Sequence, residues 1–157
     1  MKFNTATTEM AKQKTSELFA EIRKICSAHE TQGVKADSDD TNCTITNDLV
    51  SLTVGLNALN GELSVSEWDC RVNIPGEPRS GFQFHRKALS KTHFVPDWPS
   101  GGTFGWREKG RTAQHFLSLA ELAERCVNQF MTLERRNENG QIKREWRGNE
   151  RPSRSCL

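Results

Sequence analysis

The first hydrophobic pattern in the chain has the period of a helix. At 100° per residue, one arc of about 120° between Thr8 and Glu30 collects the apolar side chains and one histidine: Ala11, Leu18, Phe19, Ile22, Ile25, Cys26 and His29. Gly33 follows at the position of a helix stop. The pattern predicts a long N-terminal helix, and the polar residues 34–42 after it are expected to form a loop.

From Val50 the period changes to two. Apolar and small polar residues alternate over Val50–Ala58, which is typical of a half-buried strand. Asn60-Gly61 then predicts a two-residue type I′ turn, and Glu62–Ile74 is the expected partner strand. Because the apolar positions in this second segment change from odd to even numbers, we expect a β-bulge near Ser66-Glu67 that turns Trp68 toward the core.

The remaining strands are expected to be short. Gly81–Arg86 has the alternation of a third strand, with Phe82 and Phe84 on the core side, and a fourth could lie at His93–Val95 or at Thr103–Trp106. Strands so close in the sequence favour an antiparallel meander.

A second long helix is predicted from Thr112, as N-cap, to about Asn137. Its apolar residues spread over roughly 180° of the helix surface, which is wider than one packing face requires. We therefore expect it to contact the sheet and also either the first helix or a second subunit.

These elements predict an α+β fold, a two-layer sandwich in which an antiparallel meander of three to four strands packs against an N-terminal and a C-terminal helix. The expected domain covers residues 1–140. Residues 141–157 are basic and lack apolar periodicity, which predicts a disordered tail.

Composition and charge narrow the class of protein. Of 157 residues, 22 are basic and 20 acidic, for a net charge of +2, and no apolar run is long enough for a membrane span or a signal peptide. The five cysteines are widely spaced, odd in number and without a C-x-x-C pair. This usage favours a reducing, cytoplasmic location over a disulfide scaffold or a zinc ribbon.

The aromatic and glycine-rich segment from Phe94 to Trp106, with the basic residues after it, is the candidate site. Long irregular segments often carry function, and tryptophans beside glycines and basic groups suit stacking on a ring or docking a partner. The alternative is that Trp98 and Trp106 plug the open end of the sandwich. The candidate binding residues are Phe94, Trp98, Phe104, Trp106, Arg107, Lys109, Arg111 and Thr112.

Residues 105–112 also have the G-x-x-x-x-G-basic-Thr form of a phosphate loop. Arg111 stands where that loop has lysine, and no parallel βαβ unit surrounds it, so a modest anion site near Arg107, Lys109 and Arg111 is the better interpretation. No histidine or cysteine pattern predicts a metal or a cofactor.

We therefore expect a small non-catalytic binding or regulatory module that recognises a protein partner or a small anionic ligand, and that forms a homodimer. Two alternatives stay open. The last third of the chain, Trp106–Leu157, holds 11 basic and 7 acidic residues, which suits a nucleic-acid-binding accessory protein. A small enzyme would instead bring His85, His93 or Cys70 together in a pocket.

Overall fold

The computed structural model describes residues 5–29, 33–47, 49–70, 87–98, 102–111, 115–140 and 142. Helix α1 (Thr5–Ser27) comes first and helix α2 (Leu119–Glu138) last. Within the described ranges, seven strands lie between them: β1 (Lys35–Ser38), β2 (Asn42–Thr46), β3 (Val50–Leu56), β4 (Leu63–Asp69), β5 (Lys87–Asp97), β6 (Gly105–Glu108) and β7 (Phe116–Ser118).

The strands form one antiparallel sheet in which each strand pairs with its neighbour in the chain, in the order β1 to β7. The predicted α+β class and the meander are confirmed. The prediction of three to four strands is wrong, because the described residues alone form a sheet of seven strands.

Part of the missed sheet lies in the segment expected to be a loop. The carboxylate of Asp39 accepts hydrogen bonds from the backbone N–H groups of Thr41 and Asn42, both at 2.8 Å, and so closes a tight turn between β1 and β2. These backbone donors hold the pKa of the Asp39 carboxyl below its usual range. Only Cys43 and Ile45 mark β2 as apolar, which is too short a pattern to recognise.

The turn between β3 and β4 lies where it was predicted but is longer. The last strand pair is Leu56 with Leu63, so six residues connect the strands instead of two. Asn57 organises this connection: its backbone carbonyl accepts from Gly61 N–H at 2.8 Å and its side chain accepts from Leu59 N–H at 2.9 Å. Gly61 has a φ of +75°, a conformation that glycine adopts freely.

The predicted irregularity near Ser66-Glu67 is present, but its consequence was wrong. The register shifts between Glu67 and Trp68, and the extra residue is Leu89 on β5. Strand β4 itself keeps its phase, so that Glu67 and Asp69 are buried on the core side while Trp68 is only half-buried. Alternation in one strand could not reveal a bulge carried by its partner.

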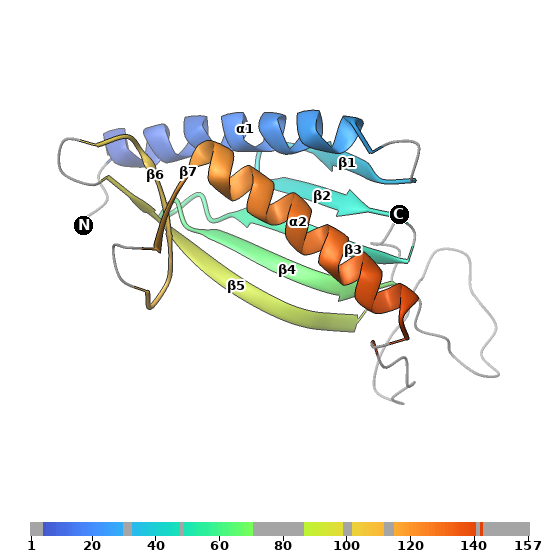
Figure 1. Cartoon of the computed structure of the whole chain (residues 1–157). Coiled ribbons are helices and arrows are strands. Elements are labelled where there is room, and N and C mark those ends of the chain that lie inside the picture. Colours follow the sequence, from blue (N-terminus) through green and yellow to red (C-terminus); the bar gives the residue numbers. More distant parts are fainter. Residues whose placement is uncertain are drawn as a thin grey trace, which may run out of the picture.

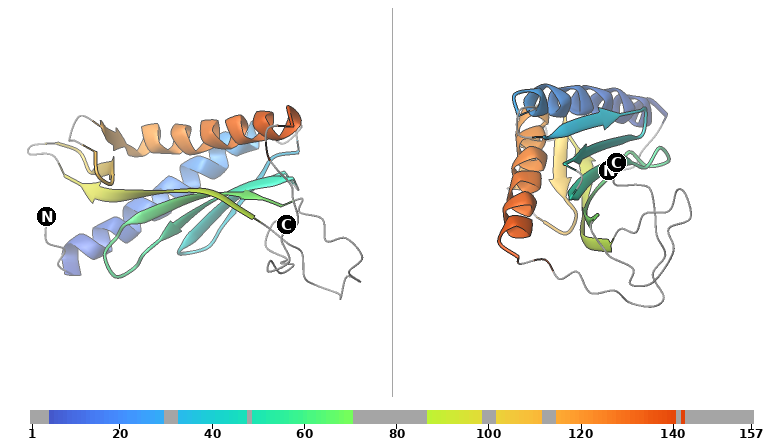
Figure 2. Two further views of the ribbon diagram at one scale, coloured as in Figure 1. Left: turned by 90° about the horizontal axis from the view of Figure 1, so that it is seen from below. Right: turned by 90° about the vertical axis from the view of Figure 1, so that its right-hand side faces the viewer.

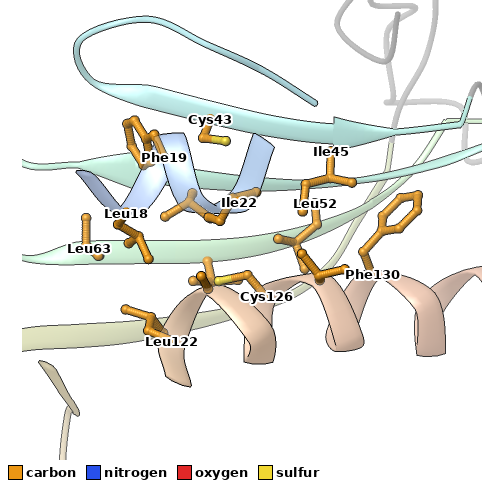
Figure 3. Packing of buried hydrophobic residues seen from close by; sticks show 14 of the residues in the cluster. Leu18, Phe19, Ile22, Cys43, Ile45, Leu52, Leu63, Leu122, Cys126 and Phe130 are labelled. Atoms are coloured by element: carbon orange, nitrogen blue, oxygen red, sulfur yellow. The ribbon is translucent and has the colours of Figure 1, made fainter. Parts of the chain in front are cut away.

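Both helices lie on the same face of the curved sheet (Figures 1 and 2). In Figure 3, Leu18, Phe19 and Ile22 of α1 meet Cys43 and Ile45 of β2 and Leu122, Cys126 and Phe130 of α2. All of these side chains are at most 2% exposed. The core therefore lies between the helices and one face of the sheet, and close packing there fixes the sheet as a rigid support.

Helix α2 begins six residues later than the sequence predicted. Its N-cap is Ser118, not Thr112, and it forms a capping box in which Ser118 Oγ accepts from Glu121 N–H and Glu121 Oε1 accepts from Ser118 N–H. The helix contacts α1 as well as β3 and β4. Its wide apolar face is thus shared between the sheet and the first helix.

The opposite face of the sheet, which we call the open face, has no helix over it in the described part of the chain (Figure 2). Two rows of paired residues cross it. The first is Asn42, Gly55, Ser64 and His93, and the second is Thr44, Thr53, Ser66 and Lys91. None of these residues is buried, and none is aliphatic.

Several sequence predictions concern residues that the structure does not describe: the strand at Gly81–Arg86 with His85, the residue Thr112, and most of the tail. Ile142 is the described residue of the tail, and it joins the core at 6% exposure. Neither α1 nor α2 has the length and apolar character of a membrane-spanning helix.

Candidate functional site

The aromatic residues of the sequence-predicted site take two different positions. Phe94, Phe104 and Trp106 are buried in the core, at 1%, 4% and 0% exposure. Trp98 is 40% exposed and packs edge-on against Phe104, with ring centroids 5.1 Å apart. Three of the four aromatic rings are therefore buried, and Trp98 alone among them exposes a large part of its ring to solvent.

The basic residues of that site are largely engaged with acids. Arg107 Nε lies 3.5 Å from Asp97 and Arg111 Nε lies 3.0 Å from Glu108. Glu108 also accepts from Arg125 of α2 at 2.6 Å. The hydrogen bond from Arg125, with a smaller contribution from Arg111, holds the pKa of Glu108 below its usual range.

Lys109 belongs to a different environment, a polar hollow at one end of the open face. The hollow has a volume of about 490 Å³. Strands β2 to β5, the β3–β4 connection and the turn after β6 all contribute to its lining, which consists of Asn42, Gly55, Leu56, Asn57, Asn60, Glu62, Leu63, Ser64, Lys91, His93 and Lys109.

The charges in the polar hollow are unevenly paired. Glu62 is satisfied, since Lys109 Nζ lies 3.3 Å from Oε1 and the Asn60 amide donates to Oε2 at 2.6 Å. Lys91 and His93 are exposed, and their side chains have no ion-pair or hydrogen-bond partner among the described residues. The hollow thus contains two side chains, those of Lys91 and His93, that can still donate hydrogen bonds, beside a carboxylate that is paired with Lys109.

Gly55 lies between Asn42 and Ser64 in the lining of the hollow. A Cβ at this position would lie 3.2 Å from Asn42 Oδ1 and 3.3 Å from Ser64 Oγ. The absent side chain therefore leaves the neighbouring amide and hydroxyl accessible, which is a common reason for glycine inside a strand.

Ser64 and His93 are direct cross-strand neighbours in the polar hollow. No hydrogen bond joins their side chains within the described structure. A serine activated as a nucleophile needs its base within hydrogen-bond reach, and the described geometry does not join this pair in that way.

The described cysteines lie away from the hollow. Cys26, Cys43 and Cys126 are free and buried in the core, and burial raises the pKa of the first to about 11 and of the other two to about 12. Cys70 is disulfide-bonded. Among the described residues, no group of three His, Cys, Asp or Glu side chains is placed to hold a metal ion.

Sequence reasoning found Lys109 and named His93 only as a candidate for the enzyme alternative, and it did not include Lys91, Asn42 or Ser64 in the site. Lys91 and His93 lie two apart on β5, and this spacing places both on one face of a strand. Asn42 and Ser64 join them only through the pairing of β2, β3, β4 and β5, which a single sequence does not display.

Comparison with known proteins adds no functional information: no family model, no curated protein and no solved structure matches the chain. The function is therefore argued from the geometry alone.

Proposed function

We propose that the protein is a small binding module whose ligand is an anionic group, a phosphate or carboxylate, held in the polar hollow of the open face. The observation that carries this proposal is the pair Lys91 and His93, whose side chains face the hollow and have no partner among the described residues. Charge-assisted hydrogen bonds to an anion are the strongest interactions such groups make.

The surrounding groups would complete recognition. Asn57 and Ser64 line the hollow with an amide and a hydroxyl group, which can donate to a polar ligand without adding negative charge. The amide nitrogen of Asn42 donates to Thr41 Oγ1 at 3.0 Å, and its Oδ1 lies beside Gly55. Glu62, the one carboxylate among the described lining residues, already lies 3.3 Å from Lys109 Nζ. Repulsion of an anion by Glu62 is thereby reduced, and the balance of charge in the hollow is positive.

The proposed anion site differs from the one that the sequence analysis predicted near Arg107, Lys109 and Arg111. Lys109 is common to both, whereas Arg107 and Arg111 are paired with Asp97 and Glu108. The sequence analysis expected a protein partner or a small anionic ligand, and the proposal keeps the second of these. The rigid sheet beneath the hollow would lower the entropy lost on binding.

Isothermal titration calorimetry with inorganic phosphate tests the proposal. Lys91→Ala should weaken binding about tenfold or more, because a hydrogen bond to a charged group contributes about 1.5–3 kcal/mol. Lys24→Ala, on the exposed surface of α1, makes the same change in net charge and is the matched control. Equal affinities for wild type and Lys91→Ala would refute the proposal.

Gly55→Val provides a second test that leaves all charges in place. Valine favours strands, and its side chain would crowd Asn42 and Ser64 at the 3.2 and 3.3 Å positions of the added Cβ. Binding should be lost while the far-ultraviolet circular dichroism spectrum is kept.

A further inference from the structure

One edge of β5 is open over more than half of the strand. Strand β6 pairs with β5 only from Phe94 to Asp97, and β4 pairs with it on the other side from Lys87 to Phe94. After Glu108 the chain turns away at Gly110, whose φ is +85°. From Lys87 to Thr92, therefore, no described strand pairs with this side of β5.

The direction of the backbone groups along this edge follows from one hydrogen bond. Lys109 N–H donates to the carbonyl of His93 at 2.8 Å, so the backbone groups of His93 face the β6 side. In an antiparallel ladder, residues two apart face the same side, and the register between Lys91 and Thr92 is regular. The N–H and C=O of Lys91 therefore face the open edge.

A groove of about 710 Å³ runs beside this edge, between β5 and α2. Thr92 and the buried Glu67 line its sheet side, and Glu121, Glu124, Asn128 and Gln129 line its helix side. A strand added to β5 would direct every second side chain into this groove.

The charges of the groove favour a basic occupant. The carboxylate of Glu67 already has partners: it accepts hydrogen bonds from Ser90 at 2.8 Å and Gln129 at 3.1 Å and lies 3.6 Å from Arg136. The guanidinium of Arg125 is likewise engaged, with Glu108. Glu124 has no partner, and Glu121 has only its capping contacts with Ser118, within the described residues. Two carboxylates thus remain without a basic partner.

We propose that an extended, basic peptide segment of a partner protein binds here by strand addition, pairing its backbone with β5 around Lys91 and directing lysine or arginine side chains toward Glu121 and Glu124. Backbone pairing to an open edge supplies affinity and the alternate side chains supply specificity. The groove lies on the helix-covered side of β5, whereas the side chain of Lys91 lines the hollow on the open face. The two sites therefore meet at Lys91, but strand addition uses its backbone and does not depend on anion binding.

The test uses NMR titration of the whole chain with a heptapeptide of alternating lysine and valine. Binding should shift the amide signals of β5 around Lys91 and those of α2 around Glu124, and it should slow hydrogen exchange of the Lys91 amide. Methylating the backbone nitrogens that face β5 should weaken binding at least tenfold, and methylating the alternate nitrogens should not.

Charge is tested separately. Glu124→Lys should weaken binding at least tenfold, whereas Glu17→Lys, on the surface of α1, should leave it unchanged. Absence of shifts at millimolar peptide, or equal effects of the two methylation patterns, would overturn the proposal. So would a Lys91 amide that is already protected in the free protein, since this would show that the chain itself or a second copy occupies the edge.

Discussion

Replacing Trp106 by alanine should remove a large part of the stability of the domain. The indole is 0% exposed and packs edge-on against Phe104, with ring centroids 5.4 Å apart at 88°. Truncating a buried aromatic side chain costs about 3–5 kcal/mol, of a total that is about 5–15 kcal/mol for a typical domain. With an m-value of about 2 kcal/mol/M, the urea midpoint should fall by about 2 M.

Trp98→Ala is the matched control. Trp98 follows β5 but is 40% exposed, and its described ring contact is with Phe104. Losing one edge-on aromatic pair costs about 0.5–1.5 kcal/mol. Urea unfolding followed by far-ultraviolet circular dichroism should therefore show a small shift for Trp98→Ala and a large one for Trp106→Ala. Similar small shifts in both variants would refute the assignment of Trp106 to the core.

Trp106→Phe separates the ring from its N–H group. The Nε1–H of Trp106 is buried and has no acceptor among the described residues. A buried donor left unpaired costs about 1–3 kcal/mol, and phenylalanine removes it while keeping most of the ring volume. This variant should be far more stable than Trp106→Ala.

Three further predictions concern stability and reactivity. Gly105→Ala should destabilise the domain by about 1–3 kcal/mol or more, measured by urea unfolding, because the new Cβ would lie 2.4 Å from the carbonyl of Leu117. Glu108→Gln should cost about 1 kcal/mol near neutral pH. Arg125 is the main cause of the lowered pKa of Glu108 in the folded state. The stability that the Glu108 carboxylate contributes is therefore fully present above its unfolded-state pKa and is lost as the pH falls through its folded-state pKa. Thermal melts of wild type and Glu108→Gln should converge in acid. Cys126, with a pKa of about 12, should be alkylated at pH 8 only as fast as the protein unfolds, which peptide-resolved mass spectrometry measures.

The long elements of the fold were predictable because their patterns are long. The arc containing Leu18 and Ile22 identified α1, and the alternation from Val50 identified β3. Strands β1 and β7 have four and three residues and carry few apolar positions. Such short strands are held by pairing with a neighbour and not by their own pattern.

The start of α2 was missed for a local reason. Thr112 and Ser118 are both good capping residues, and the choice between them depends on the pairing of β7 with β6. The capping box with Glu121 distinguishes Ser118 and is visible in the sequence as S-x-x-E.

The candidate site was only partly predictable because it depends on strand pairing. The sequence identified Trp98 and Lys109 as available groups but could not show that Trp106 is fully buried. The polar hollow combines residues of β2 to β5, of the β3–β4 connection and of the turn after β6, which are up to 67 positions apart, from Asn42 to Lys109. Their proximity is a property of the register of the sheet.

The most direct test of the anion-binding proposal is an amide NMR titration of the wild-type protein with inorganic phosphate. The proposal predicts saturable shifts at Gly55, Ser64, Lys91 and His93, which line the polar hollow, and loss of these shifts in Lys91→Ala. Saturable shifts confined to the segment around Trp98 and Arg111, or none at the four hollow residues, would contradict it.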